Sequence, residues 1–161
     1  MADTFDLVLK GATIVSHAGE SVADLAIEDG RIAALGDVAA SSARRVIDAK
    51  GLHILPGVID SQVHFREPGL EHKEDLASGS RAAVLGGVTA VFEMPNTDPL
   101  TITPEALADK VKRGHHRMHC DYAFFVGGTY DNYKHLPDWE RLPGCCGVKV
   151  FMGSSTGSLL V

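Results

Sequence analysis

The spacing of the hydrophobic residues divides the chain near residue 54. Before this point, short segments alternate apolar and polar positions and are separated by turn residues. These segments are 5–11, 12–16, 22–30, 31–36 and 44–51. Asp29 and Gly30 form a two-residue hairpin signal, because glycine adopts the positive φ that a type I′ turn requires. The pattern predicts a small antiparallel β unit.

After residue 54, strand-like and helix-like segments alternate. The strand-like segments are 54–65, 88–95, 119–128 and 147–152, and the helix-like segments are 71–87 and 103–116. This order predicts parallel strands joined by crossover helices. Thr103 can cap the second helix, and Pro104 suits its first turn. A closed (β/α)8 barrel takes about 250 residues, so this part of the chain can supply only about four strands. It is either an open three-layer α/β sheet or the first half of a barrel.

Composition narrows the classes of partner and location. With 161 residues, of which 45% are hydrophobic, the chain can bury a core. The net charge is -6, and the 15 Lys and Arg form no dominant patch, so nucleic acid is not an expected partner. Three unpaired cysteines and a start without an apolar signal core favour a reducing cytoplasm. No apolar run approaches the ~20 residues that cross a bilayer, so membrane insertion is not expected.

Polar side chains occupy alternate positions of the first strand after residue 54. They are Asp60, Gln62, His64 and Arg66. Alternate residues of a strand share a face, and the opposite, apolar face is expected to meet helices. A parallel strand covered on both sides is normally hydrophobic throughout, so the polar face is a candidate site. The alternatives are an edge strand with one face in water and, for His64 alone, a satisfied core histidine.

A lysine interrupts the apolar segment 147–152. Burying a protonated Lys149 there costs several kcal/mol unless the ammonium is paired. Burial therefore favours the neutral amine, which is nucleophilic and can capture carbon dioxide. The alternative is a lysine whose long stem reaches water from the end of the strand.

A long stretch of the chain resembles a known family. The segment ILPGVIDSQVHFREPGLEHKEDLASGSRAAVLGGVTAVFEMPNTDP closely resembles the first two strands of dihydroorotases, and the similarity continues through GVKVFMGSSTG. Dihydroorotases belong to the amidohydrolase superfamily. The resemblance implies an α/β fold, the N-terminal part of a (β/α)8 TIM-barrel amidohydrolase. Residues 1–54 would form a small β-sandwich segment, and residues 55–161 the first half of the barrel, truncated after about strand four.

The resemblance also implies a metal site. His64 corresponds to the second histidine of an HxH pair that binds a divalent metal, and Gln62 stands in place of the first. A glutamine amide is a weaker zinc ligand than imidazole. Gln62 could ligate weakly, hydrogen-bond to a metal-bound water, or mark a homologue with fewer metals or none. Lys149 corresponds to a carboxylated lysine that bridges two metals. The implied cofactor is a divalent metal, with zinc favoured, as one or two ions.

Two further positions bear on the substrate. Arg66 and Asn96 correspond to residues with which dihydroorotases hold the substrate carboxylate, and a guanidinium fork with amide donors suits that role. Allantoinase-like relatives tend to have NEPG and MPLN where this chain has REPG and MPNT. Taken alone, Arg66 could pair with Glu67 or Glu71, and Asn96 could be a turn residue.

The function implied is that of dihydroorotase, the metal-dependent reversible cyclisation of N-carbamoyl-L-aspartate to dihydroorotate in pyrimidine biosynthesis. The family's later ligands and its acid/base aspartate have no counterpart here, so no catalytic set is complete and the chain alone is expected to be inactive. One alternative is a non-catalytic homologue that acts as scaffold partner of a carbamoyltransferase. Another is a different cyclic amidohydrolase, similar to hydantoinase or allantoinase. A small-molecule substrate and a homo-oligomer are expected, since an open half barrel leaves a strand edge unpaired.

Overall fold

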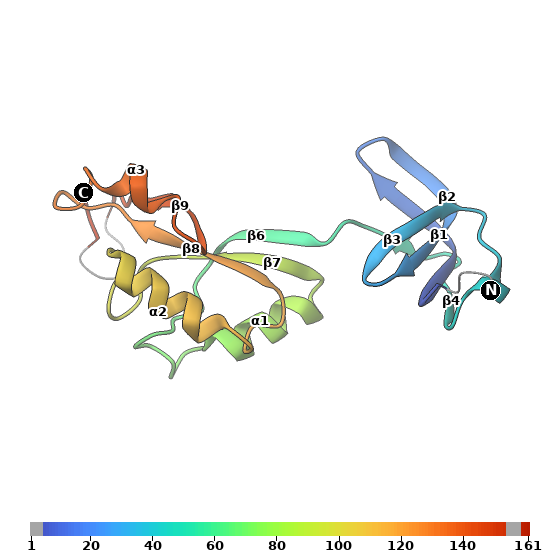
Figure 1. The fold of residues 1–161 in the computed structure, drawn as a ribbon, viewed down its shortest axis with the longest axis horizontal. Helices are drawn as coiled ribbons and strands as arrows, with labels where there is room; N and C mark the ends of the chain where they lie inside the picture. The colour runs from blue at the N-terminus through green and yellow to red at the C-terminus, as the bar shows by residue number, and fades with distance from the viewer. Residues whose placement is uncertain (1–4, 154–158) are drawn as a thin grey trace. The chain divides into compact units, whose positions relative to one another are not determined.

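The computed structural model describes residues 5–153 and 159–161, and the chain divides into two compact units, Met1–Pro56 and Gly57–Val161 (Figure 1). Each unit has its own β-sheet and its own cluster of buried hydrophobic side chains. None of the helices in the described residues is long and apolar enough to cross a membrane.

The first unit contains one five-stranded sheet in the order β3-β2-β1-β4, with β5 also paired to β1. Its strands are β1 (Leu7–Ser16), β2 (Gly19–Glu28), β3 (Arg31–Gly36), β4 (Val46–Asp48) and β5 (His53–Ile54), and a short 3-10 helix spans Ala40–Ser42. The first three strands are antiparallel, as predicted, and Asp29 and Gly30 turn between β2 and β3 with positive φ. The last two strands pair parallel to β1 instead. These residues supply one sheet, whereas a sandwich needs a second sheet packed on it.

A buried carboxylate fixes the middle of this sheet. Asp24 is 6% exposed and accepts hydrogen bonds from the backbone N–H groups of Gly11 and Val38, at 2.8 and 2.9 Å. Lys10 donates to the same carboxylate and also to the carbonyl of Val38. Together these bonds join β1, β2 and the chain after β3. The hydrogen bonds from Lys10 and the two amides hold the pKa of Asp24 at about 2, below its ordinary 3.8.

The second unit is built on a parallel four-stranded sheet in the order β6-β7-β8-β9. Its strands are β6 (Val58–Val63), β7 (Val88–Glu93), β8 (Asp121–Gly127) and β9 (Cys145–Lys149). Helices α1 (Leu76–Leu85) and α2 (Pro104–Gly114) are the crossovers, and a short α3 (Leu136–Trp139) precedes β9. The predicted alternation is confirmed.

The helix boundaries follow from local capping chemistry. Thr103 caps α2 as predicted, with its hydroxyl accepting from the N–H of Ala106. The first helix begins at Leu76, five residues after the predicted start at 71, because Asp75 is its N-cap. The Asp75 carboxylate accepts from the N–H of Ser78 at 2.7 Å, which satisfies a donor that the first turn would otherwise leave unpaired.

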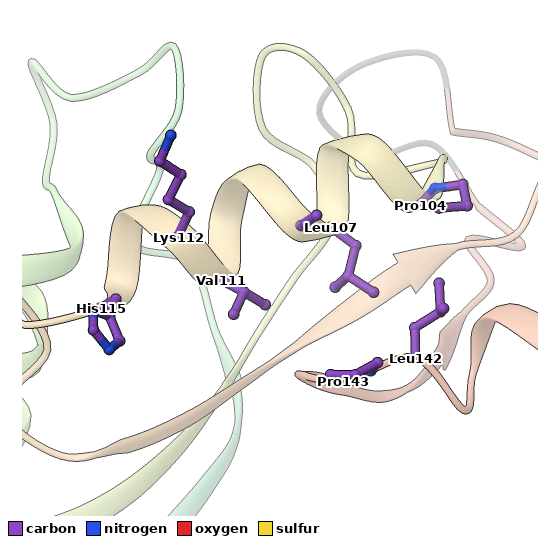
Figure 2. Close-up of a pocket in the computed structure, with 8 residues that line it drawn as sticks. Pro104, Leu107, Val111, Lys112, His115, Leu142 and Pro143 are labelled. Carbon is purple, nitrogen blue, oxygen red and sulfur yellow. The ribbon is translucent and has the colours of Figure 1, made fainter.

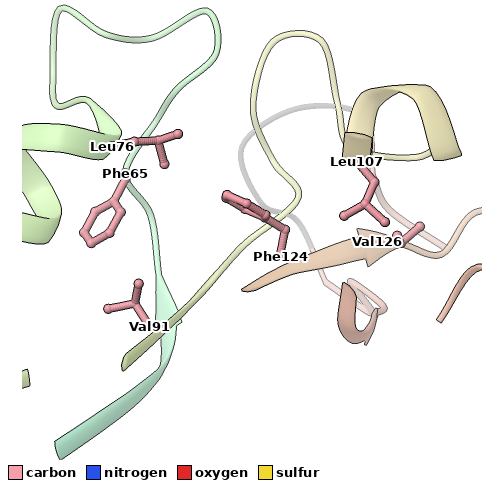
Figure 3. Close-up of a cluster of buried hydrophobic side chains, with 6 residues drawn as sticks. All are labelled: Phe65, Leu76, Val91, Leu107, Phe124 and Val126. Carbon is pink, nitrogen blue, oxygen red and sulfur yellow. The ribbon is translucent and has the colours of Figure 1, made fainter. Parts of the chain in front are cut away.

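Both crossover helices pack on one face of the sheet, where the buried cluster lies (Figure 3). The cluster joins residues from α1, α2, β7, β8 and the end of β6; they are Phe65, Leu76, Val91, Leu107, Phe124 and Val126. Phe65 packs directly on α1 at Gly79, where an added Cβ would lie 2.4 Å from the phenyl ring. Only glycine allows this approach.

The start of β6 differs from the sequence prediction. Its apolar face, Ile59, Val63 and Phe65, was expected to meet helices, but Ile59 is 59% exposed. The reason is that β6 is an edge strand of the sheet, and among the described residues the helices pack on β7 and β8. Val63 packs against the buried cluster and Phe65, beyond the end of the strand, belongs to it, so the expected face is buried only at this end.

The carboxylate network of the first unit gives a pH-dependent prediction. Because the folded-state pKa of Asp24 is lowered from 3.8 to about 2, its stabilising contribution is present above pH 3.8 and is lost as the pH falls toward 2. D24N should lower the midpoint of thermal unfolding at pH 7, and the difference from wild type should shrink across this window. D37N is the matched control, since Asp37 is fully exposed. An equal effect of both substitutions at pH 7 would contradict the assignment.

Candidate active site

The candidate site lies at the carboxyl edge of the parallel sheet. His64 directly follows β6, Asn96 lies three residues after β7, and Lys149 is the last residue of β9. The carboxyl ends of parallel strands meet at one edge, which is where ligands bind in open α/β sheets and barrels. The tertiary structure therefore brings together three positions that are far apart in the sequence.

The predicted polar face of the first strand is only partly a strand. Asp60 and Gln62 lie in β6, are exposed, and are joined by a hydrogen bond from the N–H of Gln62 to the Asp60 carboxylate at 3.0 Å. The pairing of β6 with β7 is irregular between Asp60 and Val63, and the strand then ends. His64 and Arg66 follow it in a loop, so the four polar residues do not continue one strand face.

A hydrogen bond joins His64 to Asn96. The Nδ1 atom of His64 lies 2.9 Å from Oδ1 of Asn96, whose side chain is almost fully buried. We assign the proton to Nδ1, because the amide oxygen can only accept. The other ring nitrogen, Nε2, then keeps its lone pair, which is the form of imidazole that binds metals. This positioning role of Asn96 was missed from the sequence, which associated Asn96 only with the substrate.

The surroundings of His64 favour its neutral form. Burial lowers the pKa of His64, and the positive charges of Arg66 and Lys149 act in the same direction. The hydrogen bond that His64 donates to Asn96 opposes this shift without reversing it. A neutral imidazole needs no deprotonation before it can act as a ligand or accept a proton.

Lys149 is half-buried at the end of β9, not in the middle of an apolar strand as predicted. Its ammonium lies 5.3 Å from the centroid of the Phe151 ring. His64 follows β6 and Lys149 ends β9, so both residues lie at the carboxyl edge of the same parallel sheet, and the charge of Lys149 acts on His64.

Arg66 has an unusual backbone conformation. Its φ is 66°, in the left-handed region that side chains other than glycine seldom adopt. The N–H of Glu67 donates to the carbonyl of Phe65 at 2.9 Å, which closes a tight three-residue turn with Arg66 at its centre. The suggested pair with Glu67 does not form, because Arg117 occupies that carboxylate. The positive charge of Arg66 acts instead to lower the pKa values of His64 and Glu93.

A buried ion pair lies behind these residues, and the sequence analysis missed it. Glu93 ends β7, Lys110 lies on α2, and each side chain is 1% exposed. Lys110 also donates to the carbonyl of Met94 at 3.0 Å, and the N–H of Met94 donates to Val63 at the end of β6. Burial raises the pKa of Glu93 to about 7, and burial lowers the pKa of Lys110. A sequence signal was present: Lys110 follows Leu107 by three residues, on the same helix face.

An apolar pocket of about 520 Å³ lies elsewhere, between α2 and the segment that precedes β9 (Figure 2). Leu107, Val111 and Leu142 line it, and none of the predicted site residues does. Lys112 and His115 are the polar residues of a lining that is otherwise apolar, which is a poor match to the several converging polar groups of a hydrolytic site. The carboxyl edge is therefore the stronger candidate for an active site.

Known proteins are similar to this chain in sequence and in fold. Residues 51–117 match the family model described as dihydro-orotase-like. The chain is 39% identical over 153 residues to an allantoinase from Deinococcus radiodurans, covering 94% of this chain and 34% of that protein. It is 35% identical over 155 residues to an L-hydantoinase from Paenarthrobacter aurescens, covering 94% and 33%. The solved structure of L-hydantoinase (dihydropyrimidinase) from Arthrobacter aurescens matches with a TM-score of 0.86 and 32% identity, covering 98% of this chain and 35% of that one.

These matches support the amidohydrolase superfamily. The predicted α/β fold is confirmed, because the chain matches the hydantoinase fold over nearly all its length. Dihydroorotase itself is not confirmed, since the relatives compared above are named allantoinase and hydantoinase. The chain spans about a third of the length of the curated relatives that it matches.

The donor set of this chain does not complete a metal site. Among residues 5–153 and 159–161, no group of three or more His, Cys, Asp or Glu side chains could hold a metal ion. His64 offers one imidazole nitrogen and Gln62 an exposed neutral amide, whereas a protonated Lys149 cannot ligate. A structural zinc needs four ligands, and a catalytic zinc commonly has three from the protein. The described residues supply at most part of a coordination shell.

The bond between His64 and Asn96 predicts opposite shifts for two substitutions. N96L should lower the pKa of His64 further, because it removes a hydrogen bond that raises this pKa in the wild type. N96D should raise the pKa, since a carboxylate stabilises the imidazolium. NMR titration of the His64 ring in the metal-free chain measures both, and T97V, at the neighbouring buried position, is the control. Shifts of the same sign in N96L and N96D would contradict the contact.

The buried ion pair predicts a large loss of stability in K110M. This substitution leaves the Glu93 carboxylate buried without a partner, which typically costs about 3–5 kcal/mol of unfolding free energy. The double variant E93Q/K110M should recover part of the loss, because it removes the uncompensated charge. K112M, at an exposed position of the same helix, should change the free energy by less than about 0.5 kcal/mol. Denaturant unfolding measures all three, and equal losses in K110M and K112M would refute the role of the pair.

Proposed function

We propose that this chain contributes part of the active site of a cyclic amide hydrolase related to hydantoinases and allantoinases. The observation that carries the proposal is the neutral His64, held through Nδ1 by Asn96 at the carboxyl edge of the parallel sheet. The L-hydantoinase match, with a TM-score of 0.86, supports the same class of enzyme.

The metal assignment is part of this proposal. Nε2 of His64 would be one ligand of a divalent metal, with zinc favoured by the imidazole donor. Gln62 and a carboxylated Lys149 remain predictions as further ligands of this metal. Such a metal would polarise the amide carbonyl and lower the pKa of bound water. The remaining ligands would have to come from outside the described residues.

We also propose the domain organisation expected from the sequence. Residues 1–54 would belong to a small β-sandwich, and residues 55–161 would be the first half of a (β/α)8 barrel. Support comes from the separate β unit, and from four parallel strands with the helices on one face. Homo-oligomerisation, a carbamoyltransferase partner and a cytoplasmic location stay predictions.

Dihydroorotase activity is a second candidate, favoured by one observation. The positive charge of Arg66 acts on His64 and Glu93, at the carboxyl edge of the sheet. A guanidinium fork there suits a substrate with a carboxylate, as dihydroorotate has. Asn96 would add an amide donor, because its NH2 group is not used by the bond to His64.

The test uses the gene product that includes this chain. It compares two cyclic substrates that differ by one carboxylate. Dihydroorotate carries the carboxylate and dihydrouracil does not, and hydantoin and allantoin complete the panel. R66M should lower kcat/KM for dihydroorotate by about ten- to a hundredfold, the value of a charge-assisted bidentate contact, and leave dihydrouracil little changed. R66K is the control that keeps the charge without the fork.

The outcomes separate the candidates. Hydrolysis of hydantoin or allantoin with dihydroorotate unreacted would favour the hydantoinase and allantoinase class. No turnover of any ring, with no bound zinc by metal analysis, would refute the enzyme and favour the non-catalytic homologue. The 161-residue chain alone is expected to show no turnover, because its ligand set is incomplete.

A further inference from the structure

The loop after β6 is anchored on both sides of Arg66. On the N-terminal side, the Phe65 ring is buried against Gly79 of α1. On the C-terminal side, the Glu67 side chain is almost fully buried, although it is an acidic residue in a loop. Arg66 stands between these two fixed residues, with a φ of 66°.

Glu67 is held by a complete set of donors. Arg117 binds its carboxylate through both terminal nitrogens, with Nη1 at 2.6 Å from Oε1 and Nη2 at 3.0 Å from Oε2. The N–H of Leu76, in the first turn of α1, donates to Oε2 at 3.1 Å. Arg113 lies farther away, with Nη1 at 3.7 Å from Oε1. Burial alone would raise the pKa of Glu67, but the bonds from Arg117 and Leu76 outweigh it and keep this pKa below its ordinary value.

This arrangement bears directly on Arg66. A left-handed conformation is strained for an L-residue, so it persists only where the surroundings enforce it. The turn is closed by the N–H of Glu67 on the carbonyl of Phe65, and the N–H of Leu70 donates to the carbonyl of Arg66 at 3.0 Å. Both bonds depend on where the Glu67 backbone lies, and Arg117 fixes the Glu67 side chain.

We propose that the bidentate contact between Glu67 and Arg117 is a positioning device that keeps Arg66 in its turn, two residues after His64, and thereby sets a preference for substrates with a carboxylate. The specificity part rests on dihydroorotase activity, the second candidate under the proposed function, whereas the conformational part does not. Within the described part of the chain, the Arg117 side chain hydrogen-bonds to the Glu67 carboxylate and to the carbonyl of Arg113, and neither residue is a predicted ligand or substrate residue.

Amide hydrogen exchange in the 161-residue chain tests the conformational part. In R117M, exchange at the N–H groups of Glu67 and Leu70 should become about tenfold faster or more, because a charge-assisted bidentate contact is lost. Exchange at the Met94 N–H, which donates to Val63 outside the loop, should change much less. R117K keeps the charge without the fork and should give an intermediate rate. R113M is the matched control, since it removes the same charge from the neighbouring arginine.

The test depends on the difference in exchange rate between the loop amides and the Met94 amide. Equal acceleration at Glu67, Leu70 and Met94 would mean that Arg117 only stabilises the whole unit, which would overturn the proposal. Equal effects of R113M and R117M would overturn it as well. If R117M does not fold, R117K is compared with R113M on the same amides.

Steady-state kinetics of the gene product that includes this chain test the specificity part. R117M should lower the ratio of kcat/KM for dihydroorotate over dihydrouracil by about tenfold, mainly through KM, while R113M leaves the ratio unchanged. An unchanged ratio in R117M would refute the specificity role. If the wild type hydrolyses neither of these two rings, the specificity part is refuted, and the exchange experiment still decides whether Arg117 positions Arg66.

Discussion

The buried ion pair between Glu93 and Lys110 is the contact on which the carboxyl edge of the sheet depends. It ties α2 to the last residue of β7, and the same ammonium binds the carbonyl of Met94. Met94 in turn bonds to the end of β6, directly before His64. Removing either charge would leave the other buried and unpaired, so the pair is costly to break even where its net gain over an apolar contact is small. The ends of two strands are thereby held in one place.

The charges around His64 share a sign. Arg66, Lys149 and Lys110 all act on its imidazole, and each disfavours the imidazolium. The nearby carboxylate of Glu93 is already paired with Lys110. A positive site with a neutral histidine suits an anionic ligand, whether a substrate carboxylate, a carbamate on Lys149 or a hydroxide.

The loop after β6 shows how one short segment serves structure and site together. Phe65 and Glu67 are buried against the helices, so Arg66 is held between them in a strained turn. Strain of this kind is stored where surrounding contacts exceed its cost, and it is common at ligand sites. Arg117 lies fifty residues away in the sequence, yet it determines where the Glu67 side chain lies.

The sequence by itself determined the order of the elements, the β unit before residue 54 and the alternating strands and helices after it, because these depend on the spacing of apolar residues and on local caps such as Thr103. It also pointed to His64, Arg66, Asn96 and Lys149 as candidates. Only the tertiary structure decided that Asn96 orients His64, that β6 ends before its last two polar positions, and that Glu67 pairs with Arg117 instead of Arg66. Such contacts join residues distant in sequence, and local patterns carry no information about which side chains will meet.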